Sequence, residues 1–382
     1  MIYLDNAATT RPFDAVIEEM VLVQKDMYAN PASMHSAGYA AEKKVQTALE
    51  VAKSSIGVKN GTFLFTSGGT ESNNLAFFGT LQSALKRSPH IITTKIEHPS
   101  VLEPLKFLES CGARVTYMDV DENGFVSADD VANCVCEDTK IVSVMLVNNE
   151  TGAIQPVAEI GKKVKEKNRN VLMHSDCVQA FGNVDIDVKK LGVDMLSLSA
   201  HKINGPKGVG GFYCSDRVHL SPAVMGGHQQ KNMRSGTLNT PGICGFAKAM
   251  KLTSQQTNSK RETMAKLKAQ LIAALQGDPL FAINNIGDGY SSHIISISVK
   301  NTRAEVLLHA LEAHGICISA GSACASNRPA PSHVLTAMGF DKTKTQGTIR
   351  VSLGSFNTEE EIDTFCRCLK QEATALSRFT RK

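Results

Sequence analysis

Short apolar runs alternate with longer amphipathic segments through the first half of the chain. Between about residues 60 and 215, each run is rich in β-branched or aromatic residues and is followed by a segment of helical length. This alternation predicts βαβ units that build a mostly parallel sheet. The predicted strands lie at residues 63–65, 91–93, 115–117, 141–147, 171–173 and 195–198.

The remainder of the chain has a different pattern. Residues 242–276 contain no proline and separate charged from apolar positions, which predicts one or two long helices. Beyond them, short strands and helices predict a smaller α+β unit, and the first dozen residues are expected to pack there. We therefore predict a large domain of residues 15–255 and a small domain formed by residues 1–14 and 256–382.

The composition narrows the class of protein. Hydrophobic residues make up 42% of the chain, charged residues 20%, and the net charge is only +4, too small to indicate a nucleic-acid surface. No apolar run could span a bilayer, and the start resembles no secretion signal, so we expect a cytoplasmic protein without membrane contact. The ten cysteines form no C-x-x-C pair, so we expect free thiols and no metal site.

Residues with catalytic potential follow five of the predicted strands. Carboxyl ends of parallel strands meet at one edge of a sheet, which is where ligands bind. Lys202 follows the sixth strand and opens a glycine-rich turn; it is either a desolvated amine nucleophile or a solvated loop lysine. The segments at this edge are Ser67-Gly68-Gly69-Thr70, Glu97-His98, Asn148-Asn149, Asp176 and His201-Lys202.

Three of these segments each allow two interpretations. Gly69-Thr70 at a helix start could hold a phosphate or belong to a plain Ser/Thr cap. Asp176 could face a protonated pyridine nitrogen or cap a helix. His98 could lie on an aromatic ring and move protons, or be a structural residue before Pro99.

Two further residues stand out in the last third of the chain. Arg350 lies on an apolar strand and needs an anion, either a bound carboxylate or an internal partner. Cys324 lies among small residues and prolines, so we expect an exposed, reactive thiol. Other cysteines lie among apolar residues and are expected to be inert, namely Cys111, Cys177, Cys214, Cys244 and Cys317.

Together these segments resemble the pyridoxal-phosphate (PLP)-dependent cysteine desulfurases of aminotransferase class V, of the NifS/IscS type. The resemblance runs from Tyr3-Leu4-Asp5-Asn6 to Arg350-Val351-Ser352-Leu353. Between them it includes Asn30-Pro31-Ala32-Ser33-Met34-His35, Val147-Asn148-Asn149-Glu150, Ser199-Ala200-His201-Lys202 and Gly321-Ser322-Ala323-Cys324. It implies the α/β fold of type I PLP enzymes, with a mostly parallel seven-stranded sheet in the large domain and a smaller α+β domain.

The resemblance also implies a role for each site residue. Lys202 would carry PLP and move the Cα proton, His98 would stack on the ring, and Cys324 would take sulfur from L-cysteine as a persulfide, leaving L-alanine. Arg350, with Asn149, would bind the substrate carboxylate. The expected cofactor contacts are Gly69, Thr70, Asn149, Asp176, Gln179, Ser199, His201 and, from the second subunit of a homodimer, Thr237.

The persulfide sulfur would pass to a protein acceptor such as an iron–sulfur scaffold. Alternative functions are a selenocysteine lyase or transaminase on the same fold, or a non-catalytic scaffold that binds a sulfur acceptor. Cys324 argues against the first alternative, because only persulfide chemistry needs that thiol. The complete set of Lys202, Asp176 and His98 argues against the second.

Overall fold

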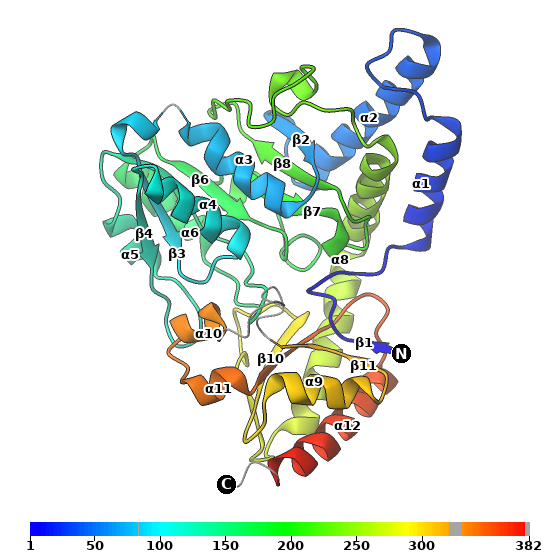
Figure 1. The fold of residues 1–382 in the computed structure, drawn as a ribbon, viewed down its shortest axis with the longest axis vertical. Helices are drawn as coiled ribbons and strands as arrows, with labels where there is room; N and C mark the ends of the chain where they lie inside the picture. The colour runs from blue at the N-terminus through cyan, green and yellow to red at the C-terminus, as the bar shows by residue number, and fades with distance from the viewer. Residues whose placement is uncertain (83, 321–330, 379–382) are drawn as a thin grey trace.

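A seven-stranded sheet forms the centre of the larger part of the molecule (Figure 1). The computed structural model describes residues 1–82, 84–320 and 331–378. The strand order is β2-β8-β7-β6-β5-β3-β4, and only β8 runs antiparallel to its neighbours. The strands are β2 (Thr62–Thr66), β3 (His90–Thr94), β4 (Arg114–Met118), β5 (Thr139–Ser143), β6 (Leu172–Asp176), β7 (Met195–Ser199) and β8 (Gly210–Cys214).

The predicted mostly parallel sheet is therefore confirmed, and each of the six strands predicted by pattern is present. The prediction of a strand over residues 141–147 was too long at its end, because β5 stops at Ser143 and the chain turns toward Asn148. The apolar pattern continued there because residues 144–147 are buried without being part of a strand.

Helices cover both faces of this sheet, which explains why most residues of its strands are buried, those of the edge strand β4 excepted. Side chains of α3 (Gly69–Leu81) and α4 (Pro99–Ser110) form one core with the sheet. Those of α2 (Ser36–Ser55), α6 (Val157–Lys167) and the first part of α8 (Thr240–Leu275) form the other. The other helices in this larger part of the molecule are α1 (Asp14–Asp26), α5 (Ala128–Asn133) and α7 (Val188–Leu191). Its short 3-10 helices are η1 (Leu85–Arg87), η2 (Ala200–Lys202) and η3 (Gln230–Asn232).

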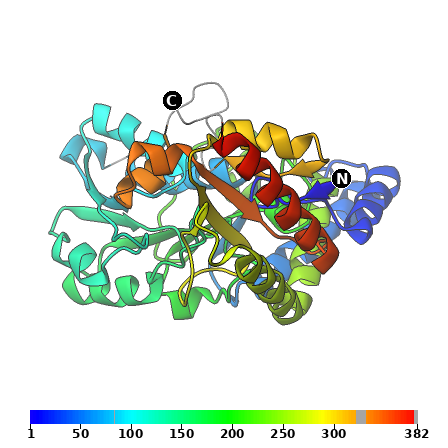
Figure 2. The ribbon, with the colours of Figure 1, turned by 90° about the horizontal axis from the view of Figure 1, so that it is seen from below.

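A smaller antiparallel sheet, of order β12-β13-β10-β9, has its own core. Seen from below, α12 (Glu359–Ser377) lies beside α8 on the outside of this part (Figure 2). Leu4 belongs to this core, and β1 (Ile2–Tyr3) pairs with β11 (Ile316–Cys317). The other elements are β9 (Phe281–Ile283), β10 (Ile294–Val299), α9 (Ala304–Glu312), β12 (Ser319–Ala320), α10 (His333–Ala337), α11 (Lys342–Gln346) and β13 (Thr348–Ser352). The boundaries given above for the two domains stay a prediction.

One long helix, α8 (Thr240–Leu275), connects the two parts (Figure 1). Phe246 and Met250 near its start pack in the core of the large sheet, whereas Leu267 and Leu271 near its end pack in the small one. Of the one or two helices predicted here, the structure has one. Within the described ranges, no helix is long and apolar enough to cross a membrane.

Candidate active site

A cavity of about 280 Å³ lies at the carboxyl edge of the large sheet. Ten of the twelve predicted site residues line it, namely Gly69, Thr70, His98, Asn149, Asp176, Gln179, Ser199, His201, Lys202 and Arg350. Thr237 is exposed and does not line this cavity. Cys324 lies outside the described residues. Residues from six separate segments of the chain thus meet in one place.

Lys202 stands at the end of η2, directly after β7. Its Nζ donates hydrogen bonds to the carbonyl oxygens of Ala7, at 2.5 Å, and Ala8, at 2.7 Å. Gln179 Nε2 also donates to the Ala7 carbonyl, at 2.8 Å. The side chain is half-buried against the N-terminal segment, so the alternative of a solvated loop lysine is wrong.

Asp176, the last residue of β6, is only 5% exposed and is held by a neighbouring amide. Asn73 Nδ2 donates to its Oδ2 at 2.7 Å, and the backbone N–H of Val178 donates to its Oδ1 at 2.9 Å. No helix begins there, so the alternative of a helix cap is wrong. Both of these donors are neutral N–H groups, which leaves this buried carboxylate suited to a cation in the cavity.

The same amide connects Asp176 to His98. Asn73 Nδ2 also donates to Ser100 Oγ at 2.8 Å, and Ser100 Oγ lies 2.8 Å from His98 Nδ1. His98 is the N-cap of α4, and its Nδ1 accepts the backbone N–H of Ser100. Burial lowers the pKa of His98, more than Asp176 raises it, so the imidazole is neutral near neutral pH. The structural interpretation is therefore confirmed, since His98 caps a helix; it also lines the cavity, and its role on an aromatic ring stays a prediction.

The start of α3 forms the other end of the cavity. Its N-cap is Gly68, which has no side chain to offer, so the alternative of a plain Ser/Thr cap is wrong. Ser199 Oγ is buried and has no hydrogen-bond partner among the described residues. His201 Nδ1 lies 3.1 Å from Thr9 Oγ1, and burial lowers the pKa of His201 to about 4. A helix N-terminus with an orphaned hydroxyl is suited to a phosphate.

Arg350 is 4% exposed and already has internal partners. Its Nη2 donates to Asp5 Oδ1 at 2.9 Å, and its Nη1 donates to the Asn149 carbonyl at 2.8 Å. Its Nε is buried without a partner among the described residues. The predicted internal ion pair is thus present, and the same guanidinium still borders the cavity.

Several residues that hold this site were not among the predicted ones. Ala7 and Ala8 form one wall and accept from Lys202, while Asn73 and Ser100 join Asp176 to His98. Asn73 lies four residues after Gly69 on α3, and helical periodicity would place both on one side of the helix. Ala7 and Ala8 gave no such signal, because only their backbone is used.

The expectation for the cysteines was partly wrong. The nine described cysteines are all free. Cys177, Cys214 and Cys244 are buried, and burial raises the pKa of Cys214 and Cys244 to about 11, as expected for inert thiols. Cys111 is exposed because it follows the end of α4, and Cys317 is half-buried as the last residue of the short strand β11.

The cavity fits PLP on three observations. The buried carboxylate of Asp176, whose hydrogen bonds come from two neutral N–H groups, suits a protonated ring nitrogen, and the orphaned Ser199 hydroxyl beside the α3 N-terminus suits the phosphate. Lys202 supplies the amine that this aldehyde cofactor requires, in the same cavity.

Comparisons with known proteins identify the family. The aminotransferase class-V family model matches residues 2–365. The chain belongs to the class-V aminotransferase family. It is 41% identical over 366 residues to the cysteine desulfurase IscS of Clostridium botulinum strain Hall, covering 95% of this chain and 91% of that protein.

Solved structures place it in the same branch of the family. A NifS-like protein matches with a TM-score of 0.93 and 39% identity, covering 98% of this chain and 100% of that one. SspA in complex with cysteine matches with a TM-score of 0.83 and 33% identity, covering 94% and 100%. The chain is thus of the NifS/IscS cysteine desulfurase type, and the expected enzyme class, fold and PLP cofactor are confirmed. The alternative functions are not favoured.

Proposed function

We propose that this chain is a PLP-dependent enzyme that removes sulfur from L-cysteine, leaving L-alanine and a persulfide on Cys324. The observation that carries the proposal is the single cavity that contains Lys202, Asp176, His98 and Arg350. An amine, a buried carboxylate, a neutral imidazole and a guanidinium together provide for cofactor, proton transfer and an amino-acid carboxylate.

Each residue has a separate task in this proposal. Asp176 would pair with the ring nitrogen, His98 would stack on the ring, and Gln179 and Asn149 would bind the ring substituent that carries oxygen. Gly69, Thr70, Ser199 and His201 would hold the phosphate. When bound, the cofactor supplies an electron sink that makes the Cα proton of an amino acid acidic.

Lys202 moves the proton. Its amine takes the Cα proton of L-cysteine and returns a proton to product, which requires the amine to be released from the Ala7 and Ala8 carbonyls and partly dehydrated. Arg350 holds the substrate carboxylate through N–H groups that Asp5 and Asn149 do not use.

Cys324 performs the sulfur transfer. Its thiolate attacks the substrate Sγ, so that a sulfur–sulfur bond forms as the substrate Cβ–Sγ bond breaks. Cβ keeps the electron pair of the broken bond and takes up one proton, so it becomes a methyl group. The sulfur pair is oxidised while Cβ is reduced, so L-cysteine and a thiol give L-alanine and a persulfide without another reactant.

Replacing Cys324 tests this proposal. We expect Cys324→Ala to bind PLP with its visible absorbance band and to release no sulfide from L-cysteine in the presence of a thiol reductant. Cys111→Ala, which removes another exposed thiol, should keep full activity. Sulfide release by Cys324→Ala at the rate of the unchanged protein would refute the assignment.

We also propose a homodimer in which Thr237 completes the site of the partner subunit. Thr237 is exposed and is absent from the cavity of its own chain, which supports this arrangement. The segment before it contains an unusual cluster of non-glycine residues with positive φ, at His228, Gln230, Lys231 and Asn232. Such backbone persists where the surroundings enforce it, frequently at functional sites.

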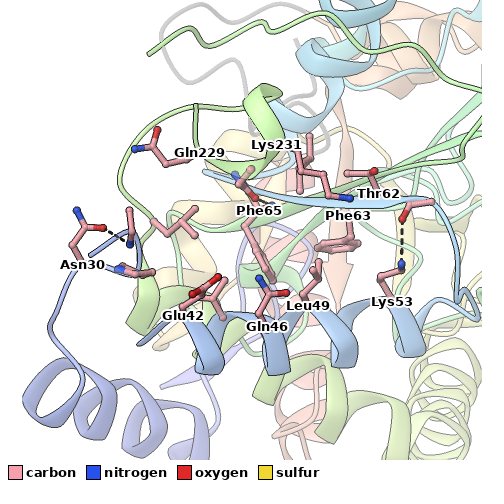
Figure 3. A pocket seen from close by; sticks show the side chains of 17 residues that line it. Asn30, Glu42, Gln46, Leu49, Lys53, Thr62, Phe63, Phe65, Gln229 and Lys231 are labelled. Carbon is pink, nitrogen blue, oxygen red and sulfur yellow. Dashed lines mark hydrogen bonds between the residues drawn. The ribbon is translucent and has the colours of Figure 1, made fainter. Parts of the chain in front are cut away.

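A second cavity, of about 330 Å³, lies beside the segment that precedes Thr237 and supports the proposal that this surface contacts the second subunit (Figure 3). It lies between α2, the edge strand β2 and the segment with Gln229 and Lys231, and it shares no residue with the first cavity. Gln230 fixes that segment, because its side chain bonds both the N–H and the carbonyl of Phe65. Nearby Tyr28 and Met34 are exposed, as expected of residues that a second copy covers.

Mixed dimers test whether the Thr237 that completes a site comes from the same chain or from the second subunit. Lys202→Ala and Thr237→Ala chains are each expected to have low activity alone. If Thr237 acts across the interface, a dimer of one chain of each kind contains one intact site, and co-expression restores sulfide release. Failure of mixed dimers to recover activity, with dimers present in sedimentation, would refute the contribution in trans.

For the fate of the sulfur, we propose transfer from Cys324 to a protein acceptor such as an iron–sulfur scaffold. We further propose that the enzyme works in the cytoplasm. The free state of all nine described cysteines is compatible with a compartment that keeps thiols reduced.

A further inference from the structure

Helix α10 begins where the segment that contains Cys324 rejoins the described chain. That segment ends at residue 330, and α10 starts at His333 with Ser332 as its N-cap. In sequence α10 lies among elements of the small sheet. Its apolar residues instead pack against Ile96 and Met145, which follow strands of the large sheet, in a separate core with Val334, Leu335 and Met338.

This packing brings α10 to the border of the candidate active site. Met145 lines the first cavity, and Ile96 lies two residues before His98. His333 Nε2 lies 2.9 Å from the backbone carbonyl of Glu97, which precedes His98. The start of α10 therefore contacts the turn that carries His98.

A buried pair of side chains makes the second contact. Ser332 Oγ donates to Glu150 Oε2 at 2.5 Å, and both residues are less than 6% exposed. The same Ser332 oxygen accepts the backbone N–H of Leu335. An N-cap needs only that acceptor, so the donation to Glu150 is an additional tie between α10 and the large sheet.

Glu150 lies on a turn whose shape is fixed from within. Asn148 Oδ1 accepts the N–H groups of Glu150 and Thr151, both at 2.9 Å, and Asn148 Nδ2 donates to the Ile96 carbonyl. Asn149 lies between Asn148 and Glu150, and its backbone carbonyl accepts a hydrogen bond from Arg350. Burial raises the pKa of Glu150 to about 7, against the opposing effects of Ser332 and Arg350. A carboxylate in such a position is costly unless its hydrogen bond is kept.

We propose that Glu150 is a positioning residue for the sulfur-transfer step: through Ser332 it fixes the point from which the Cys324 segment departs, beside Asn149 and Arg350. The inference rests on the proposed function, because it concerns the step that Cys324 performs. Proton removal at Cα needs Lys202 and the cofactor but not Cys324. Loss of the Glu150 contact therefore affects sulfur transfer and leaves proton removal intact.

Two measurements on the PLP-loaded enzyme separate these steps. One follows exchange of the Cα proton of L-alanine in D2O by NMR, and the other follows sulfide release from L-cysteine. For Glu150→Gln and for Ser332→Ala we expect exchange to stay near the wild-type rate and sulfide release to fall roughly tenfold. The double variant should be no worse than either single one, because both remove the same contact. Ser332→Thr, which keeps the hydroxyl, should retain sulfide release.

Ser127→Ala is the matched control, since it removes an N-cap of the same type from α5 at an exposed position. It should change neither rate. Equal loss of exchange and sulfide release in Glu150→Gln, or no loss of either, would overturn the inference. If the wild-type protein exchanges the Cα proton but Cys324→Ala releases sulfide normally, the proposed function fails, and this inference fails with it.

Discussion

The two sides of the active-site cavity are built in different ways. On the sheet side, His98, Asp176, Ser199 and Lys202 stand at or just after the ends of parallel strands, and their spacing follows from the sheet. On the small-domain side, Arg350 and Ser332 reach Asn149 and Glu150 only because segments about 180 to 200 residues apart meet. The first side depends on local strand geometry and the second on long-range packing, so mutations should affect them differently.

The largest effect is expected on the sheet side, at Lys202. Lys202→Ala should reduce Cα proton exchange of L-alanine by about 10³-fold or more, because it removes the base from the cavity. Lys202→Arg keeps a cation that can donate to Ala7 and Ala8, yet it should also fail, since a guanidinium is not deprotonated at neutral pH. NMR in D2O measures both, and near-normal exchange in either variant would contradict the role of Lys202.

The next largest effect tests the small-domain side. Arg350→Lys should lower kcat/KM for L-cysteine by about 100-fold, mainly through KM, because a planar bidentate donor is lost. Asp5→Asn keeps Arg350 and a carbonyl that can accept its Nη2 hydrogen bond, so it should lower kcat/KM much less. If steady-state kinetics show equal losses in both variants, Arg350 serves the internal ion pair and not the substrate.

A smaller effect is expected where the two sides meet, at Glu97. Burial raises the pKa of this carboxyl to about 8, so the folded protein keeps a proton that the unfolded chain releases at ordinary acid pH. The contribution of Glu97 to stability therefore falls as pH rises through the range between these two values. We expect the free energy of unfolding of cofactor-free Glu97→Gln, measured by thermal unfolding, to rise relative to wild type by on the order of 2 kcal/mol between pH 5 and pH 8. Glu122→Gln, at an exposed position, should show no such pH dependence.

The smallest effect is expected at Ser199, where substitution should have opposite effects on protein stability and on PLP binding. Its hydroxyl is buried without a partner among the described residues, so Ser199→Ala should leave the cofactor-free protein as stable or up to ~1 kcal/mol more stable. The same variant should bind PLP more weakly in titrations of the cofactor-free protein. Ser197→Ala on the same strand removes a hydrogen bond to His174 and should therefore destabilise the cofactor-free protein. Unchanged PLP affinity in Ser199→Ala would remove Ser199 from the phosphate site.

The sheet side of the cavity could largely be predicted from the sequence, whereas the small-domain side could not. The β-branched runs and the residues after them predicted six strands and seven residues of the cavity, because alternation and strand ends are local properties, whereas Gln179 and Ser199 came from the family resemblance. The identity of Asp5 as the internal partner of Arg350, the Asn73 bridge and the contact of Ser332 with Glu150 were not predictable in this way. Each joins segments whose proximity depends on how the helices and the two sheets pack.

Helix α8 has a consequence for how the molecule unfolds. Between Phe246 and Gln276 it contains neither glycine nor proline, and at ~1.5 Å per residue its 36 residues extend over about 54 Å. Its two ends belong to different cores, so melting of either core exposes apolar residues of a helix that the other still holds. We therefore expect the two cores to unfold together in thermal denaturation, although each has its own sheet.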